Sequence, residues 1–341
     1  MRNIFSNKSA GFGAVIGNLC MLFAAIFWGV NVSATKGLLA PDWMSSNGII
    51  VVRLVGGCIL MWIVSLFIKC AKIDRSDWLK VILGGSVGLF LFIYLFIRSL
   101  AYGNPIDISI IMTLPPIFVI LIGVIFQKQR PSLIEYIGVI ISFIGAAIVI
   151  LANGSGKAGS NNLLGDILAI ASTICYAFYL VIIEKPSSKY KPITLLRWLF
   201  LFAAIPALFL IPGMQHEKIL HGAPADPWIL IAFILICPTF LAYFLVQPAE
   251  KLIGSELVSL YQYLLPVFAT ISAVLMLGDH LKAIQVLAMA IIVVGMVFTN
   301  VGKRRRKQKM LQAQALSQPT AESAPSGTPA SNSVSTPQPT H

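Results

Sequence analysis

The chain has 341 residues, of which 57% are hydrophobic and only 11% carry a charge. In a water-soluble domain about one quarter of the residues are charged. A protein this apolar would expose large hydrophobic patches to water, so the composition excludes a cytosolic enzyme. The net charge of +12 indicates nucleic acid only if the basic side chains form a patch on a soluble face. We therefore expect an all-α polytopic membrane protein with no nucleic-acid partner.

Ten apolar runs are long enough to cross a bilayer as helices, which takes about 20 residues each. In chain order they cover residues 17–37, 48–68, 79–99, 106–126, 132–152, 164–184, 193–212, 228–248, 256–278 and 283–301. The first run is preceded by residues 1–16 and has no small-residue cleavage site. We interpret it as a retained span and residues 1–16 as a cytoplasmic N-terminus.

Lysine and arginine are distributed unevenly over the loops between these spans. If the N-terminus is cytoplasmic, 18 of the 25 lie on the cytoplasmic side, five lie on the opposite side, and Arg53 and Arg197 lie inside spans. Because cytoplasmic loops carry the excess of these residues, the pattern predicts that both termini are cytoplasmic.

The composition changes after residue 301. A basic run at 303–307 is followed by a segment rich in Ser, Thr, Pro, Ala and Gln that ends at His341. Such a segment buries too little apolar surface to fold, so residues 302–341 are predicted to be a disordered cytoplasmic tail. The basic run is either a positive stop after the last helix or a site for anionic lipid headgroups.

The two halves of the chain resemble each other at a nearly constant offset. Pro-Ile-Phe at 116–118 recurs as Pro-Val-Phe at 266–268, and other matches keep the same order. An odd number of spans per half makes the second half enter the membrane from the opposite side, which is typical of secondary transporters. The sequence therefore predicts two inverted five-helix repeats, residues 17–152 and 164–301, joined by a flexible connector at 153–163.

Polar groups inside spans indicate where a solute would bind, because they are costly in lipid and should face the bundle interior or a wet cavity. Helical spacing places aromatic and amide side chains on common faces of several spans. The candidates for lining a cavity are Trp28, Asn31, Met112, Tyr176, Tyr179, Tyr243, Gln247 and Gln262. The alternative is that these side chains join helices or lie at headgroup level.

The two arginines inside spans are further candidates for binding the solute. Arg53 lies early in the second span, and Arg197 has the corresponding place in the seventh. Each would attract a carboxylate or phosphate; the alternative is a guanidinium that reaches the headgroups or ties helices together. No carboxylate lies at mid-span, so a coupling residue for protons or sodium is not evident, and facilitated or weakly coupled transport stays open.

The sequence contains no pattern typical of a catalytic or metal site. The histidines lie in or beside loops, no Ser-His-Asp or paired-carboxylate set shares a face, and Gly-Ser-Gly-Lys at 154–157 lacks the other residues of a phosphate loop. The five cysteines show no metal-ligand spacing and are expected to be small buried hydrophobes. We expect no enzyme activity, no cofactor and no metal.

Taken in order, the motifs resemble the drug/metabolite transporter superfamily, and within it the EamA-like permeases. They are Trp-Gly-Val-Asn at 28–31, Arg53, Leu-Pro-Pro-Ile-Phe at 114–118, Gly-Asp at 165–166, Tyr-Ala-Phe-Tyr at 176–179, and Leu-Leu-Pro-Val-Phe at 264–268, through Gly278-Asp279 to Gly295. The family often has a Gly-Glu pair after spans 4 and 9. Here these places hold Lys128-Gln129 and Gly278-Asp279, a departure that weakens the subfamily assignment.

The resemblance implies a secondary transporter of a small organic metabolite in a bacterial inner membrane, with export as the expected direction. Aromatic walls with few charges suit an amino acid or a related amphipathic solute. The expected partners are the solute and the lipid bilayer, and the expected state is a monomer or homodimer. Two alternatives stay open: a nucleotide-sugar or organic-phosphate exchanger, which needs basic residues deep in the cavity, and a membrane scaffold or embedded enzyme.

Overall fold

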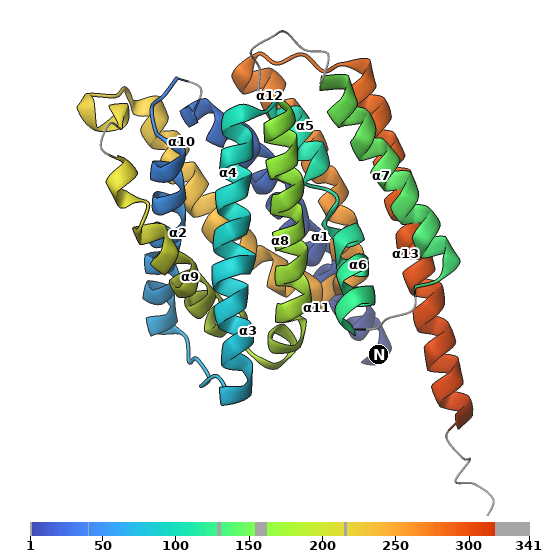
Figure 1. Ribbon diagram of the computed structural model, residues 1–341. Coiled ribbons are helices and arrows are strands. Elements are labelled where there is room, and N and C mark those ends of the chain that lie inside the picture. The colour runs from blue at the N-terminus through green and yellow to red at the C-terminus, as the bar shows by residue number, and fades with distance from the viewer. Residues whose placement is uncertain (1, 40, 128–130, 154–161, 215–216, 318–341) are drawn as a thin grey trace, which may run out of the picture.

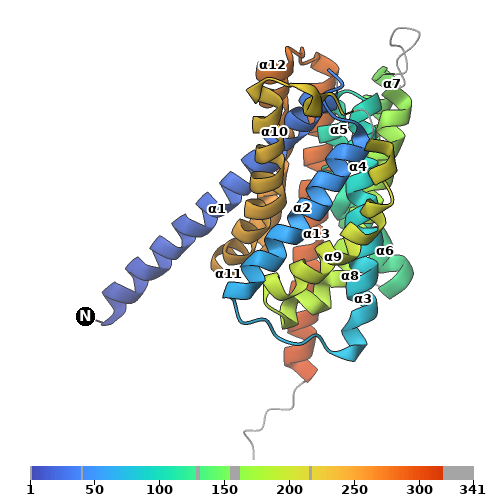
Figure 2. The same cartoon turned by 90° about the vertical axis from the view of Figure 1, so that its left-hand side faces the viewer.

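The computed structural model describes residues 2–39, 41–127, 131–153, 162–214 and 217–317, and every regular element in those ranges is a helix. The helices stand side by side as one bundle (Figure 1), and the first part of α1 projects away from it (Figure 2). The α-helices are α1 (Arg2–Leu39), α2 (Ser46–Phe67), α3 (Trp78–Leu83), α4 (Phe92–Tyr102), α5 (Pro105–Ile111), α6 (Pro115–Gln127), α7 (Leu133–Asn153), α8 (Asn162–Lys189), α9 (Pro192–Leu208), α10 (Ala225–Ile236), α11 (Ala242–Tyr261), α12 (Leu265–Leu277) and α13 (Ala283–Ser317). The 3₁₀-helices are η1 (Arg75–Asp77), η3 (Ile211–Met214), η4 (Lys218–His221) and η6 (Gln262–Leu264), and the π-helices are η2 (Gly84–Leu91) and η5 (Cys237–Leu241).

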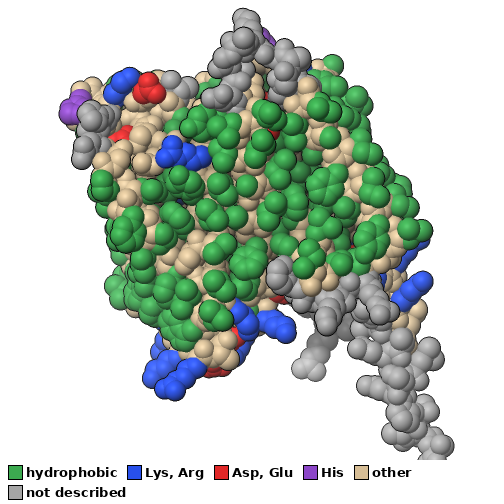
Figure 3. Space-filling model, viewed as in Figure 1, with side chains coloured by type: hydrophobic (Ala, Val, Ile, Leu, Met, Phe, Trp, Pro, Cys, Tyr) green, Lys and Arg blue, Asp and Glu red, His purple; other side chains and the backbone are tan. Residues whose placement is uncertain are grey.

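The expected all-helical membrane architecture is confirmed. Within the described residues, eight helical runs are long and apolar enough to cross a bilayer, and the two shorter apolar helices are α9 and α12. Together they correspond to the ten predicted spans. Figure 3 shows a broad band of hydrophobic side chains over the visible face, with Lys and Arg mostly below it. Such a band is the surface expected of a protein that contacts lipid acyl chains.

The two halves of the chain pack in an interleaved, two-fold manner. The second span of each half pairs with its counterpart (α2 with α9), and so does the fifth (α7 with α13). The first span packs on the third span of the other half in both directions, α1 on α10 and α11, and α8 on η2 and α4. This reciprocal pattern is what two inverted repeats produce, and it places the first spans of both halves at the centre.

The third span of each half contains a π-helix. In the first half it is η2, a stretch with three glycines, and in the second half it is η5, which contains Pro238. The N–H of Ala242 donates to the carbonyl of Cys237, five residues back, so the carbonyl of Pro238 is left without its usual α-helical partner. π-helices of this kind are frequent at functional sites.

The predicted spans 106–126 and 256–278 are not continuous helices. α5 ends at Ile111 and α6 begins at Pro115, and η6 separates α11 from α12, which has Pro266 in its first turn. Because proline has no N–H and fits best at the start of a helix, each proline begins a new segment. The breaks at residues 112–114 and 262–264 are 150 positions apart, which is the offset of the sequence repeat.

The segment after residue 301 differs from the sequence prediction. Disorder was expected from residue 302, whereas α13 continues to Ser317. Lysine, arginine, glutamine, methionine, leucine and alanine, which dominate this stretch, favour helices even without a buried face. Arg306 also pairs with the buried Glu135 of α7 at 3.5 Å (Nη2 to Oε2). The remainder of the predicted tail, residues 318–341, and most of the connector, residues 154–161, lie outside the described residues.

α7 and α13 form a close pair along one edge of the bundle (Figure 1). A Cβ added to Gly295 of α13 would lie 2.6 Å from the carbonyl oxygen of Gly138 in α7, and one added to Gly145 would lie 2.6 Å from Ile292 Cγ1. Ser142 Oγ donates to the Ile292 carbonyl across the same interface at 3.3 Å. Small residues that let backbones approach drive helix association in lipid, where apolar contact alone provides little.

The loop after α12 contains a carboxyl group through which the stability of the fold depends on pH. Gly278 ends α12 at a φ of +68°, a left-handed conformation suited to glycine, and the next residue is Asp279. Burial raises the pKa of the Asp279 carboxyl, and its Oδ2 has no hydrogen-bond partner. A carboxyl with a raised folded-state pKa favours the folded state below its unfolded pKa, and this contribution is lost as the pH rises through the folded value.

We therefore expect Asp279→Asn to raise the melting temperature at neutral pH relative to the native chain, with the difference shrinking toward pH 4. Thermal unfolding of both proteins in the same detergent between pH 4 and 8 measures this. A difference that is constant over this range would contradict the prediction.

Candidate functional site

A cavity lies between the two halves near the middle of the bundle. It contains about 710 Å³ of empty space, part of which is open to the outside. Both halves contribute side chains, and most of these are aromatic or apolar, as is usual for a small-molecule site. The lining residues are Trp28, Asn31, Val32, Arg53, Phe92, Phe96, Met112, Pro115, Tyr176, Tyr243 and Leu265.

Six of the ten candidates from the sequence line this cavity. They come from five different helical segments or breaks, and the structure brings them together although they are spread over more than 200 residues of chain. They are Trp28, Asn31, Arg53, Met112, Tyr176 and Tyr243.

Trp28 is held by the π-helix η5. Its indole Nε1 donates to the carbonyl oxygen of Pro238 at 3.2 Å, the same carbonyl that the π-turn leaves free. Its ring meets that of Tyr243 edge to face, with centroids 6.1 Å apart. Because Trp28 belongs to the first half and Pro238 to the second, this wall of the cavity depends on how the halves are placed relative to each other.

Arg53 is buried in α2, with 5% of its surface exposed. Its Nε donates to Thr239 Oγ1 at 3.0 Å, and Thr239 Oγ1 donates in turn to the Ile234 carbonyl at 2.8 Å. The guanidinium lies over the ring of Phe96, 6.0 Å from its centroid. Its Nη1 is buried and has no hydrogen-bond partner among the described residues. Arg53 is thus fixed on one side and has unused donors on the other.

Tyr179 supports the cavity wall without lining it. Its ring stacks on that of Tyr176 with centroids 5.8 Å apart and an interplanar angle of 15°. Tyr176 in turn packs on Phe92 at 4.8 Å. A Cβ on Gly88 of the π-helix η2 would lie 2.7 Å from Tyr179 Cβ, so this glycine allows η2 to approach α8. Tyr179 therefore positions Tyr176.

Arg197 does not line the cavity. Its guanidinium lies over two indole rings, 5.3 Å from the centroid of Trp62 and 5.5 Å from that of Trp198. Cation–π contacts of this kind join α9 to α2. This placement fits the alternative given for Arg197 in the sequence analysis, an arginine that ties helices together.

Two further candidates are placed only through their backbones. Gln247 lies in α11, and Gln262 begins η6, at the break between α11 and α12. The side chains of both lie outside the described part of the structure.

Several lining residues were missed by the sequence analysis. Phe92 and Phe96 form one wall of the cavity, and Val32 and Leu265 also contribute. A search based on polar groups in spans cannot find them, because an apolar side chain in a span is equally compatible with lipid. The sequence feature that could have indicated Phe92 and Phe96 is their spacing, since aromatic residues four positions apart lie on one helix face.

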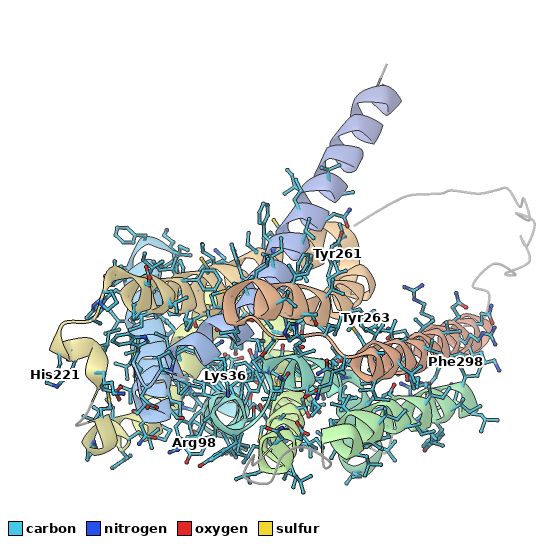
Figure 4. The ribbon with its side chains drawn as sticks, turned by 90° about the horizontal axis from the view of Figure 1, so that it is seen from above. Lys36, Arg98, His221, Tyr261, Tyr263 and Phe298 are labelled. Carbon is cyan, nitrogen blue, oxygen red and sulfur yellow. The ribbon has the colours of Figure 1, made fainter. Side chains whose placement is uncertain are left out.

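Polar contacts join the two halves at both ends of the bundle. At one end Ser33 and Ser272 share a hydrogen bond of 2.7 Å, and Gln285 Nε2 donates to Asp107 at 2.8 Å. At the other end Tyr261 Oη donates to Asn18 at 2.9 Å. Figure 4, a view along the bundle, shows Tyr261 next to the projecting part of α1 and places Lys36 well inside the bundle. These contacts tie the two halves together at both ends of the bundle.

Among the described residues, no group of three or more His, Cys, Asp or Glu side chains is placed to hold a metal ion. The five cysteines are free, one of them (Cys58) buried and the others partly buried. The cavity lining thus consists of aromatic rings, one amide, one guanidinium and aliphatic side chains. This set can bind and orient a solute by stacking and hydrogen bonding.

Comparison with known proteins gives a consistent set of matches. The model of the EamA-like transporter family matches residues 15–151 and 163–301. An uncharacterized transporter of Bacillus subtilis, YyaM, is 24% identical over 70% of this chain and 79% of its own length. The uncharacterized inner membrane transporter YicL of Salmonella typhimurium is 23% identical over 85% of this chain and 97% of its own. A solved crystal structure, described only as that of a protein, shares the fold with a TM-score of 0.54 at 18% identity, over 85% of this chain and 97% of its own.

Proposed function

The chain belongs to the EamA-like transporter family, and on this basis we propose that it moves a small organic metabolite by alternating access, binding it in the central cavity. The observation that carries the proposal is the cavity itself, which lies between two inverted halves and is walled by aromatic side chains from both. An amino acid or a related amphipathic solute suits this lining, and we propose export as the direction.

Orientation and location are part of the same proposal. The excess of Lys and Arg in alternate loops supports cytoplasmic positions for both termini. The name of the Salmonella relative supports the bacterial inner membrane. We propose residues 17–152 and 164–301 as the two repeats, a monomer or homodimer as the working unit, and transport without a cofactor or catalytic step.

The irregular helices provide a means for the cavity to open alternately. η5 bonds to the lining residues Trp28 and Arg53, and η2 packs on Tyr179, which stacks on the lining residue Tyr176. The break at Met112 and Pro115 forms part of the lining itself. At such breaks the ladder of backbone hydrogen bonds is already interrupted. The helix segments on either side can therefore tilt relative to each other without breaking further backbone hydrogen bonds. We propose that these segments tilt in opposite senses in the two halves during transport.

The alternatives are less well supported by the cavity. A nucleotide-sugar or organic-phosphate exchanger needs several cations to balance a di- or triphosphate, whereas Arg53 is the one charged side chain among the described residues that line it. A scaffold has no requirement for an aromatic cavity between its halves. A thermal-shift screen of the purified chain against amino acids, nucleosides and sugar nucleotides separates these options, since a ligand that binds the folded state raises its melting temperature.

Substitution of Trp28 tests the cavity as the transport route. We expect Trp28→Ala to reduce transport of the best solute from that screen at least about tenfold in liposomes, because it removes an aromatic wall worth a few kcal/mol of contact. Trp228→Ala is the matched control, since Trp228 is 47% exposed on α10 and does not line the cavity. Equal transport by both variants would contradict the proposal; Trp28→Phe, which keeps a ring, distinguishes loss of the wall from loss of folding.

A further inference from the structure

We infer that Arg53 forms a carboxylate subsite in the cavity, so that the solute is an organic acid with an aromatic or similarly flat apolar body. This inference rests on the proposed transport function and narrows the class of solute. A positively charged amino group on the solute is not required.

The first argument is the unused hydrogen-bonding capacity of Arg53. A guanidinium has five N–H donors, and among the described residues Arg53 makes one side-chain hydrogen bond, from Nε to Thr239 Oγ1. Nη1 is buried without a partner, although the side chain is 95% removed from the surface. A buried cation without a counter-ion is strongly unfavourable, and an anion at the cavity side of the guanidinium would relieve that cost. Arg53 lines the cavity, so a bound solute can reach it.

The second argument is the absence of a resident counter-ion. No Asp or Glu is among the described residues that line the cavity. Among the described residues, the groups that contact or face Arg53 are the hydroxyl of Thr239, the ring of Phe96 and the phenol of Tyr243, and none of them is a carboxylate. By contrast, Arg306, whose side chain is 20% exposed, pairs with the carboxylate of Glu135. The negative charge for Arg53 must therefore come from outside the lining.

The third argument concerns which anion fits. The planar fork of a guanidinium matches the two oxygens of a carboxylate. A phosphate monoester would bring nearly two negative charges to one arginine, and the described lining offers no second cation. A cationic solute would be repelled by Arg53 and would find no carboxylate to bind. A single carboxylate is the anion that leaves the cavity neutral.

The body of the solute is set by the rings around Arg53. Phe96 lies under the guanidinium, Phe92 packs on Tyr176 at a tilt of 32°, and Trp28 meets Tyr243 edge to face. Such surfaces favour a flat apolar group placed between them by offset or edge-to-face contacts. An ammonium group would gain some cation–π attraction from the ring faces, but it would lie in the same cavity as the positive charge of Arg53 and would find no carboxylate among the described lining residues.

Three probes with the same aromatic body separate the contributions of the two charges. They are 3-phenylpropionate, which has the carboxylate alone; phenylalanine, which has both groups; and phenethylamine, which has the amine alone. Binding to the purified full-length chain is measured at pH 7.5 by thermal shift and by titration calorimetry. We expect 3-phenylpropionate and phenylalanine to bind with affinities within about tenfold of each other and phenethylamine not to bind.

Substitution of the two arginines inside spans identifies the subsite. We expect Arg53→Lys, which keeps the charge but loses the fork, to weaken binding of 3-phenylpropionate at least about tenfold, the size of one charge-assisted hydrogen bond. Arg197→Lys is the matched control and should leave binding unchanged, since Arg197 packs on Trp62 and Trp198 away from the cavity.

Three results would overturn the carboxylate subsite: binding of phenethylamine as tight as that of 3-phenylpropionate, unchanged binding by Arg53→Lys, or no binding of either carboxylate probe to the native chain. The comparison of the three probes on the native chain does not depend on any variant folding. The transport proposal is judged separately, because loss of transport in Trp28→Ala for any solute would stand even if these probes failed.

Discussion

Replacing Gly138 with valine is expected to prevent the chain from reaching a stable folded state. A Cβ at this position would lie 2.5 Å from the backbone nitrogen of Thr299 in α13, and the carbonyl of Gly295 is equally close. Both contacts are with backbone atoms, so no rotamer change relieves them and the two helices must separate. We expect a loss of about 3 kcal/mol or more, the upper range for overpacking, because the hydrogen bond of Ser142 across the interface is lost as well.

The measurement is thermal unfolding in detergent, together with the fraction of protein that elutes as a single species. Ala147→Val is the control, since Ala147 lies on the exposed side of the same helix, α7, and receives a side chain of the same size. We expect it to unfold like the native chain. Similar melting temperatures for Gly138→Val and the native chain would show that α7 and α13 do not depend on this close approach.

Replacing Gly29 with alanine is expected to abolish transport while leaving most of the fold intact. Gly29 is buried where α1 crosses α12, and an added Cβ would lie 2.6 Å from Phe268 Cβ and 3.0 Å from the Leu265 carbonyl oxygen. α1 must then move away from α12. The neighbouring Trp28 would move with it and lose its hydrogen bond to Pro238, and Leu265 lines the cavity as well. A shift of about 1 Å at a binding site can cost about a hundredfold in rate.

Transport in liposomes by Gly29→Ala is therefore expected to fall at least about tenfold, with a smaller effect on melting temperature than that of Gly138→Val. Gly37→Ala is the matched control on the same helix. Its Cβ would lie 3.4 Å from the nearest atom, Leu230 Cδ1, which is ordinary contact with the end of a flexible side chain. Full transport by Gly29→Ala would show that the contact between α1 and α12 does not control the cavity.

The ten spans and the repeat could be predicted from the sequence because both depend on long-range patterns, hydropathy and spacing, that survive low identity between the halves. The interruptions could not. Pro115 and Pro266 were visible, but whether a proline in a span causes a kink or begins a new helix depends on which neighbours satisfy the freed carbonyls. The π-helices depend on the same kind of contact, as the bond from Trp28 to Pro238 illustrates.

The site was predictable in part for a related reason. Trp28, Asn31, Arg53, Tyr176 and Tyr243 are polar or amphipathic side chains whose helical positions required an explanation, and they line one cavity. The two mates Arg53 and Arg197 differ in placement, since Arg53 lines the cavity and Arg197 packs on two tryptophans. Duplicated halves keep their backbone geometry while single side chains diverge, so position within a repeat predicts helix packing better than it predicts the role of a side chain.

The paired irregularities have a thermodynamic consequence. Each half has a π-helix in its third span and a break in its fourth, and the halves are inverted. If each half adopts the conformation of the other half during transport, the state open to one side and the state open to the other contain nearly the same set of bent and straight helices. Their free energies should then differ little, so neither is a deep resting minimum. A solute that prefers one state by only about 1–2 kcal/mol would be enough to shift the population by about five- to thirtyfold.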